Sequence, residues 1–448
     1  MDNYFVSSCK RVKDWICRQF GQKEKKTVHH KKFADGGEVI VWETGRAGEE
    51  AASYENLFLR KEIAGFRTNI RREQSCSIKS LTRDYLYKQL LSSGEYTFDH
   101  MLVIKDPYGE APLTALALFM LEEPACVRVT TKGNLKETDF VTELPKKKEH
   151  RVPILGMYAE KANDIVIEIL DDEGNCVKSH TFTIRTKRLP KSLRNVITVK
   201  KWTDKPAYSN IMINGGVKIH TCVFDIEGKI RYYLSRKPRG YGIFPLSDGH
   251  FFYMEKYISV PSYSNPQTVE SYDMDYFGRV FRTYLTEKGV HHTAEEKAGG
   301  NILTGSNSML EHTEDCVIEI DRQTGEIVWQ LNMAEIFDET YQNMMDWCHV
   351  NSAAYYEKDR TILISLRNSF AFCVSLAAGR AWSPRRLITS TSMVFIGALS
   401  GNTNNGTDFL SLSTKFFETQ RTIGKHFEEQ RKTQGRNHHA SLPADVFL

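Results

Sequence analysis

The sequence predicts an all-β protein with two domains, a β-sandwich followed by a β-propeller. Two observations indicate this fold class. Short apolar or β-branched segments, separated by turn-forming residues, run from about residue 100 to about residue 185. Beyond residue 195 a hairpin pattern recurs three times, at a period typical of propeller blades. A chain of 448 residues is long enough for two to three domains.

Residues 1–95 are polar and rich in charge, and helical spacing is clearest at Leu81–Leu91, so a partly helical segment is expected. Residues 96–188 hold five short strand candidates bounded by turn signals, which favours a β-sandwich. The basic stretch Lys187–Arg194 is the expected linker to the next domain. The five strand candidates are Met101–Ile104, Thr114–Phe119, Val127–Thr130, Ile165–Ile169 and His180–Ile184.

The repeat region, 195–370, holds three hairpins of one plan. Each has an apolar strand, a turn that begins with Asp and closes with Gly, and a second apolar strand. The turn aspartates Asp225, Asp275 and Asp321 lie 50 and 46 residues apart. A further strand precedes each later hairpin, and four-stranded units at this period are typical of a β-propeller. A β-sandwich whose hairpins happen to resemble one another is the alternative.

The last segment, 371–448, lacks this hairpin pattern. It carries nine basic and five acidic residues, which accounts for the whole net charge of +4. Because the repeat stops before this segment, the propeller is expected to be incomplete. A shifted reading frame or a truncation is the hypothesis for this basic tail. The alternative is a diverged ending, in which the tail folds back or a partner chain completes the ring.

Composition excludes several classes of function. The balanced charge of residues 1–370 argues against a nucleic-acid partner. The longest apolar runs are about half the length that a bilayer requires, so no membrane partner is expected. The nine cysteines are scattered and form no CxxC pair, which favours neither a disulfide framework nor a zinc knuckle. Since the N-terminus lacks the apolar core of a signal peptide, a cytoplasmic location is expected.

Two histidines occupy similar positions in consecutive repeats. His292 lies eight residues, and His349 ten residues, before the next predicted strand. Residues in equivalent positions of successive blades converge on one axis, so we expect the two imidazoles to lie together. Asn351 follows closely, and Arg367 comes 18 residues after His349. A cluster of such donors suits a tetrahedral oxyanion, because each group can donate towards negative charge.

Each of these residues also has a structural interpretation. A histidine beside Trp347 can be a packed core residue, and Arg367 can simply pair with a carboxylate. No metal is predicted, although a metal site is a further alternative. Its carboxylate is not at a diagnostic ligand spacing. The alternative metal set is His291, His292, Glu295 and His349.

Two motifs resemble a known family. Trp347–Tyr356, followed by Thr361–Arg367, resembles the signature of the bacterial arylsulfate sulfotransferases, which is Trp-x-His-x-Asn-Ser and then an isoleucine-rich strand that ends Ser-x-Arg. Asp106–Leu116 and Arg151–Tyr158 resemble the N-terminal domain of that family. The resemblance covers about residues 95–369. It implies a β-sandwich placed before a six-bladed propeller.

The resemblance implies an enzyme, a nucleotide-independent aryl-sulfate sulfotransferase that needs no cofactor. It would transfer a sulfuryl group from a phenolic sulfate ester to a phenol by a ping-pong mechanism through a sulfohistidine. By motif, His292, His349 and Arg367 would be catalytic and Asn351 would bind substrate. The implied partners are a small-molecule sulfate donor and a phenol acceptor. Association with a second copy of the chain stays open.

The nucleophile cannot be assigned by motif. In the family this histidine lies in a later blade, within an aromatic-rich Gln-His motif that the sequence does not contain. His426, His438 and His439 sit in no matching context and are expected to be solvated tail residues. The alternative function is therefore an inactive, truncated propeller that binds anionic aromatic ligands or a protein partner.

Overall fold

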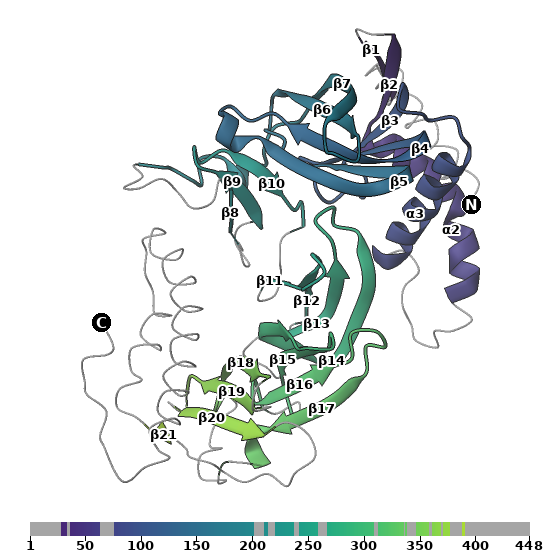
Figure 1. The fold of residues 1–448 in the computed structure, drawn as a ribbon. Coiled ribbons are helices and arrows are strands. Elements are labelled where there is room, and N and C mark those ends of the chain that lie inside the picture. The colour runs from purple at the N-terminus through teal and green to yellow at the C-terminus, as the bar shows by residue number, and fades with distance from the viewer. Residues whose placement is uncertain are drawn as a thin grey trace, which may run out of the picture. The chain divides into compact units, whose positions relative to one another are not determined.

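The structure, a computed structural model, describes most of the chain between residues 28 and 389. Its elements are mostly strands, with few helices (Figure 1). Apart from two short strands, the expected tail 371–448 lies outside the described residues, as do the three tail histidines. The described residues are 28–33, 36–62, 76–200, 210–213, 220–236, 242–258, 267–308, 312–335, 337, 346–357, 361–368, 371–376 and 388–389.

The first sheet forms the predicted sandwich. Its order is β1-β2-β3-β4-β6-β7, with β5 paired to β4. The long strand β4 pairs with β3 through its first half and with β6 through its second half, and its register with β5 shifts between Met120 and Ala125. This bend lets one sheet fold over a single apolar core. The strands are β1 (Val28–Phe33), β2 (Gly37–Trp42), β3 (His100–Lys105), β4 (Ala115–Thr131), β5 (Phe140–Ile154), β6 (Ala162–Leu170) and β7 (Cys176–Arg185).

Two helices, α2 (Thr44–Glu62) and α3 (Cys76–Ser92), connect β2 to β3. These strands run parallel, and a parallel pair requires such a crossover connection. In β3, Met101 and Val103 belong to the sandwich core, whereas Leu102 and Ile104 belong to the core beneath the helices. Alternate residues therefore serve two cores, which explains the unbroken apolar run. The sheet starts at residue 28, before the boundary expected at residue 96.

The repeat region consists of antiparallel meanders, as predicted for propeller blades. A three-stranded sheet, β10-β9-β8, is followed by the seven-stranded sheet β11–β17 and the four-stranded sheet β18–β21. The strands are β8 (Asn210–Ile213), β9 (Cys222–Asp225), β10 (Ile230–Tyr233), β11 (Gly242–Pro245), β12 (Phe251–Ile258), β13 (Gln267–Met274), β14 (Val280–Glu296), β15 (Ile302–Ser306), β16 (Cys316–Ile320), β17 (Ile327–Asn332), β18 (Val350–Tyr356), β19 (Thr361–Leu366), β20 (Ala371–Leu376) and β21 (Ile388–Thr389). Short 3-10 turns lie at Lys136–Thr138, Lys191–Leu193 and Met333–Glu335.

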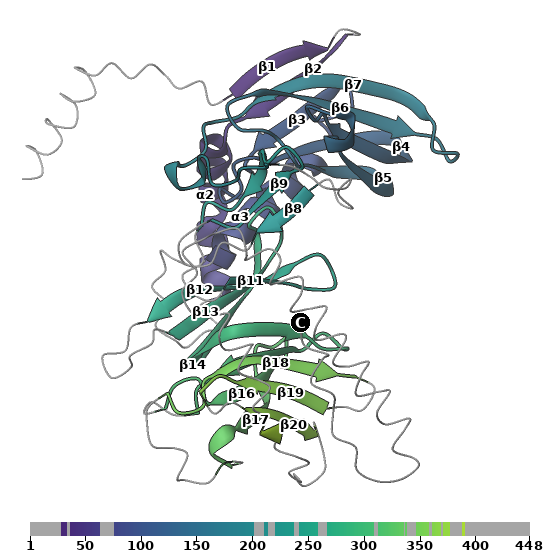
Figure 2. The same cartoon turned by 90° about the vertical axis from the view of Figure 1, so that its left-hand side faces the viewer.

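One strand belongs to two blades. The first part of β14 pairs with β13, and its last part pairs with β15. It is the fourth strand of one unit and the first strand of the next, so two blades form a single sheet. The following blade begins with β18, which contacts β14 (Figure 2). Pairing of β19 with β20 carries this blade past residue 370, where the repeat was expected to end.

The repeated turns have one hydrogen-bond pattern. The aspartate carbonyl accepts from the closing glycine at 2.8–2.9 Å, and the Oδ1 atom accepts two further backbone N–H groups at 2.8–3.1 Å. Each glycine has φ of 76–78°, a conformation that costs other residues strain. The Asp-to-Gly signature is therefore a structural requirement of the hairpin. The turns pair Asp225 with Gly228, Asp275 with Gly278, and Asp321 with Gly325.

The first blade shares its core with the sandwich, since residues of β9 and β10 belong to the sandwich's apolar cluster. Arg231 of β10 is fully buried at this junction. Its Nε donates to the Gly156 carbonyl at 2.6 Å, and its Nη1 donates to the Thr138 carbonyl at 2.7 Å. The same Nη1 lies 3.6 Å from the buried Asp225 carboxylate. One arginine thus joins the blade to the sandwich.

A second junction fixes the start of β14. The backbone N–H of Val280 donates to Ser80 Oγ of α3 at 2.9 Å. One helical turn later, Asp84 of α3 pairs with Arg279 at 2.6 Å. Strand β14, which supplies His292, is therefore attached at its start to helix α3. Among the helices described, none is both long and apolar enough to cross a membrane.

Replacing Arg231 by Met should lower the free energy of unfolding by about 3 to 5 kcal/mol, because Asp225 would stay buried without its cation. Urea denaturation of the full chain measures this. The control is Arg128→Met, since Arg128 pairs with the exposed Glu143 and should change stability by less than about 1 kcal/mol. Equal unfolding midpoints for the two variants would contradict the role of Arg231.

Candidate functional site

Strand β14 carries a bulge where it enters its second blade, and β18 carries one near the start of the following blade. The register of β14 with β15 shifts between His291 and Ala294, and that of β18 with β19 shifts between Val350 and Ser352. His292 lies inside the first bulge. A bulge bends its strand and redirects a side chain, and bulges are frequent beside active sites. The two blades therefore present side chains at equivalent points.

The structure brings His292 and His349 together, as expected from their positions in the repeat. Their Nε2 atoms lie 2.9 Å apart, and the ring centroids are 4.8 Å apart. Both residues have a left-handed backbone, with φ of 57° and 52°. Arg367 reaches the same place, because its backbone N–H donates to the carbonyl of His349 at 3.0 Å. The chemical roles of these residues stay predictions.

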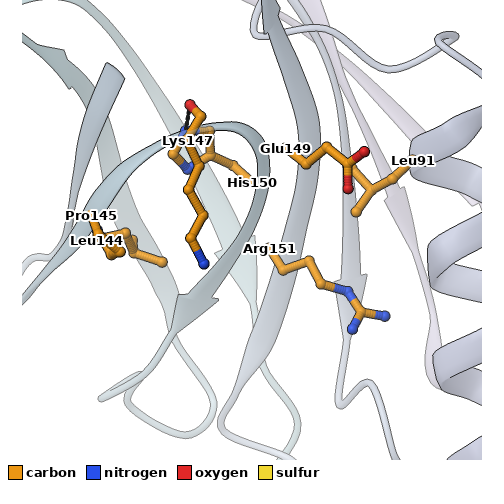
Figure 3. Close-up of a pocket in the computed structure, with 7 residues that line it drawn as sticks. All are labelled: Leu91, Leu144, Pro145, Lys147, Glu149, His150 and Arg151. Carbon is orange, nitrogen blue, oxygen red and sulfur yellow. Dashed lines mark hydrogen bonds between the residues drawn. The ribbon is translucent and has the colours of Figure 1, made fainter. Parts of the chain in front are cut away.

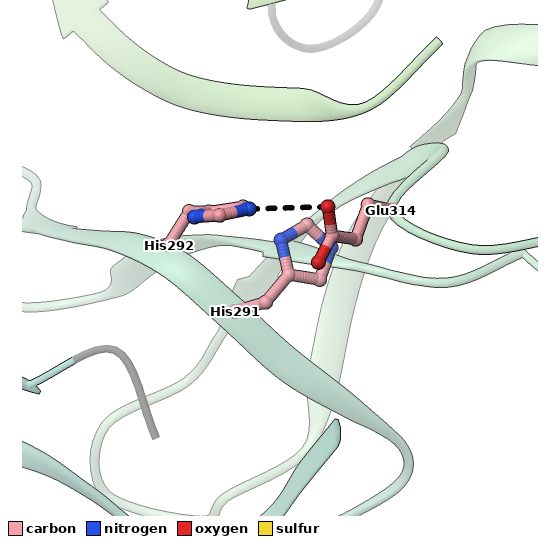
Figure 4. A group of neighbouring side chains, drawn as sticks. All are labelled: His291, His292 and Glu314. Carbon is pink, nitrogen blue, oxygen red and sulfur yellow. Dashed lines mark hydrogen bonds and ion pairs between the residues drawn. The ribbon is translucent and has the colours of Figure 1, made fainter. Parts of the chain in front are cut away.

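Glu314 contacts both histidines and was not predicted from the sequence. It lies just before β16 and is fully buried. Its Oε2 atom is 3.0 Å from Nε2 of His292 (Figure 4) and 2.6 Å from Nδ1 of His349. Burial alone would raise the pKa of Glu314, but the hydrogen bonds with the two histidines hold it far below its ordinary value. The carboxylate is therefore ionised beneath the imidazoles.

A second carboxylate faces His349. Both carboxylate oxygens of Asp346 lie 2.9 Å from Nδ1 of His349, so we assign the proton to this nitrogen. Burial alone would lower the pKa of His349, but the hydrogen bonds to Asp346 and Glu314 outweigh it and raise the pKa. The Nη2 atom of Arg367 lies 3.0 Å from the same Nδ1 and 3.6 Å from Asp346. Its guanidinium therefore packs beside the ring and pairs with the carboxylate.

Two other predicted residues have different surroundings. His291 is fully buried and donates from Nε2 to the Ser306 carbonyl at 2.9 Å. Burial lowers the pKa of His291 to about 4, so it is neutral and supports the bulge. Asn351 is the extra residue of the bulge in β18 and is half-buried, two positions beyond His349.

One residue of the alternative metal set, Glu295, does not group with the histidines. Its carboxylate instead accepts the backbone N–H of Tyr355 at 3.1 Å. Two other sets could bring ligand atoms together, namely His291, His292 and Glu314, or Glu314, Asp346 and His349. Tetrahedral zinc would hold its nitrogen and oxygen ligands about 3.3 to 3.6 Å apart, given bonds of about 2.0 to 2.2 Å. The observed contacts of 2.6–3.0 Å fit direct hydrogen bonds better.

Arg367 is the most exposed member of the cluster. Its side chain is 39% exposed, that of Asp346 is 20% exposed and that of His292 is 17% exposed, whereas Glu314 is fully covered. With neutral imidazoles, the two carboxylates and one guanidinium leave a formal charge of −1. An imidazolium at His349, whose pKa is raised, would cancel that charge. An anion that approaches the cluster would therefore meet the guanidinium of Arg367 first.

A pocket of about 280 Å³ lies on the sandwich, and its lining includes no residue of the histidine cluster (Figure 3). Figure 3 shows the side chains of Lys147, Glu149 and Arg151 of β5 among those that line it. The guanidinium of Arg151 donates to the Asp84 carbonyl at 3.2 Å and lies over the ring of Tyr87. This arginine is therefore committed to packing against α3.

Of the two carboxylates that sequence reasoning missed, one left a signal. Asp346 stands three residues before His349, a spacing at which a side chain can return to the ring. Glu314 left none, because it lies in a connection outside the repeated hairpins.

Two family models match the chain. The model described as "Arylsulfotransferase Ig-like domain" matches residues 102–187, and the model described as "Arylsulfotransferase (ASST)" matches residues 195–378. Together they cover more than half of the 448 residues. The chain belongs to the arylsulfotransferase family. The resemblance inferred from sequence motifs is thereby confirmed, and the histidine cluster lies within the second match. That match runs past the end of the repeat expected at residue 370.

Similar solved structures are distant, and no curated protein sequence matches the chain. They include the periplasmic gluconolactonase PpgL of Pseudomonas aeruginosa, at 9% identity and a TM-score of 0.26 over 61% of this chain and 76% of that one. An auxiliary nutrient binding protein of Bacteroides thetaiotaomicron has 12% identity and a TM-score of 0.26, over 61% and 66%. The β-propeller domain of Cps50 (Swd1) of Myceliophteria thermophila has 11% identity and a TM-score of 0.23, over 60% and 71%.

His291 should make the stability of the chain sensitive to acid. The unfolded chain binds a proton at His291 below about pH 6.5, whereas the folded chain does so only near pH 4. Stability therefore falls as the pH drops through this window, by about 3 kcal/mol from this residue. His291→Gln keeps a donor for the Ser306 carbonyl and does not titrate, so it should lose that part of the pH dependence.

Urea denaturation of both chains at several pH values within that window tests this prediction. A parallel pH dependence in wild type and His291→Gln would show that His291 does not contribute. The two chains should differ least near neutral pH, where His291 is neutral in both the folded and the unfolded state.

Proposed function

We propose that the chain is an arylsulfate sulfotransferase, which transfers a sulfuryl group from a phenolic sulfate ester to a phenol acceptor through a sulfohistidine. The observation that carries the proposal is the pair of His292 and His349 with Arg367 beside it, inside the arylsulfotransferase match. These groups come from two blades and are held in contact, so their donors converge on one point. The proposed substrates need neither a nucleotide nor a metal.

The charges of the cluster favour a sulfate ester as ligand. The transferring group carries a negative charge spread over its oxygens, and donors fixed in advance stabilise it as the transition state forms. Arg367 contributes a permanent positive charge, and the raised pKa of His349 favours its imidazolium form. Asn351, which lies two positions beyond His349, is proposed to donate its side-chain amide to the same oxygens.

The proposed reaction has two balanced steps. A histidine lone pair attacks sulfur, the S–O bond to the aryl group breaks, and the phenolate leaves with a proton from the site. The oxygen of the acceptor phenol, which loses its proton, then attacks the same sulfur, and the S–N bond breaks. Free histidine and a new sulfate ester result. The attacking histidine is not assigned, and the tail histidines lie outside the described residues.

Arg367→Lys should lower kcat/KM by about 10- to 100-fold, because a lysine cannot offer the planar pair of donors. The assay follows release of 4-nitrophenolate from 4-nitrophenyl sulfate with an excess of phenol. Arg282→Lys is the matched control, since Arg282 is 35% exposed and pairs with Asp273 at 3.0 Å rather than with the His292–His349 pair. Equal rates for both variants would remove Arg367 from the site.

Intact-protein mass spectrometry after brief exposure to the donor, without acceptor, tests the covalent step. A gain of one sulfuryl group, mapped to a histidine and lost on addition of phenol, is the expected result. A folded chain that turns over no ester and gains no mass would instead support the alternative, an inactive propeller that binds anionic aromatic ligands.

A further inference from the structure

Glu314 holds an unusual backbone conformation within the site. Among the described residues, six other than glycine have a positive φ, and three of them meet here: His292 at 57°, Glu314 at 58° and His349 at 52°. Histidine visits this region more readily than most residues, whereas a glutamate there is strained. Such strain persists only where the surroundings impose it, and it gathers at functional sites.

The surroundings that impose this conformation are visible. The backbone N–H of Glu314 donates to Asn307 Oδ1 at 2.6 Å. Its carbonyl accepts the backbone N–H of Val350 at 2.6 Å, which is the residue after His349. Glu314 is thus fixed on one side to the end of β15 and on the other to the start of β18. It bridges two blades through its backbone as well as its side chain.

We propose that Glu314 is a positioning residue, whose single carboxylate orients His292 and His349 for the anionic ester. The proposal rests on the proposed function for its catalytic part. One oxygen lies 3.0 Å from Nε2 of His292 and accepts from Nδ1 of His349 at 2.6 Å. This contact selects Nδ1 of His349 as a nitrogen that carries a proton. It leaves Nε2 of His349 turned towards His292 rather than towards the carboxylates.

Other charged groups around the pair set the background for any titration. They come from four places in the chain, namely β14, the segment before β16, the segment before β18 and the residue after β19. Of these groups, Glu314 lies within hydrogen-bond distance of both rings. In the part of the chain that the structure describes, the charged and titratable groups that face the pair include His291, Glu314, Asp346 and Arg367.

Glu314→Gln removes the charge while it keeps the size of the side chain, and Asp315→Asn is its matched control. Asp315 is the next residue and is equally buried, but its carboxylate accepts from Ser308 at 2.7 Å instead of contacting the histidine pair. Side-chain NMR of the full chain, with ¹³C- and ¹⁵N-labelled histidine, follows the titration of each ring. We expect the titration of His349 to move to lower pH in Glu314→Gln and to stay in place in Asp315→Asn.

The enzymatic readout is separate from the NMR readout. With 4-nitrophenyl sulfate and phenol, Glu314→Gln should lower kcat about tenfold or more and shift the pH profile, while KM changes less. Glu314→Asp keeps the charge with a shorter reach and should recover part of the loss. It also serves as the test variant if Glu314→Gln does not fold, since its shortened side chain cannot keep both contacts.

Histidine titrations that are the same in wild type and in both Glu314 variants would overturn the proposal. If the wild-type chain shows no transfer but the titration of His349 shifts as expected, the proposed function fails while orientation of the pair by Glu314 stands. Equal shifts in Glu314→Gln and Asp315→Asn would also overturn it, because loss of any buried charge would then suffice.

Discussion

Strand β14 is the constraint on which the site depends, because it is built into two blades at once. At its start it is tied to α3 through Val280 and Ser80, and twelve residues later it reaches the bulge at His292. Between these points its backbone is paired with β13 and then with β15. An extended strand so paired has little freedom to shift. The sandwich, the helices and the first imidazole of the site are thus placed by one continuous element.

The sequence predicted the parts of the fold whose signals are local. The Asp-to-Gly turns were evident because each needs a carboxylate acceptor and a glycine with positive φ. The meeting of His292 and His349 followed from the repeat itself. In contrast, β5 was hidden by its charged, exposed middle, around Lys146–Glu149. Glu314 was hidden because contacts between blades depend on the lengths of irregular connections, which no period describes.

The site holds negatively and positively charged side chains in contact. Its buried side holds the ionised carboxylate of Glu314, which together with Asp346 fixes the proton on Nδ1 of His349 and raises the pKa of that ring. The guanidinium of Arg367 is its most exposed group and, under the proposed function, would attract the anionic ester. Arginine alone would bind an ester tightly in the ground state as well as in the transition state. Histidines held by carboxylates can in addition exchange protons as charge develops, which is the kind of difference that lowers a barrier.

The burial of Arg231 limits how the sandwich and the propeller region can be separated. The two family matches meet near residues 187–195, yet Phe224 and Ile230 of the first blade pack in the sandwich core. A gene fragment cut at that border would give a sandwich with an open core and a blade whose Arg231 has lost its contacts with Gly156 and Thr138. The boundary between the two family matches is therefore not a boundary between independently folding units. Recombination that shuffles the two domains independently would produce chains with a damaged interior, so the pair is best regarded as one heritable unit.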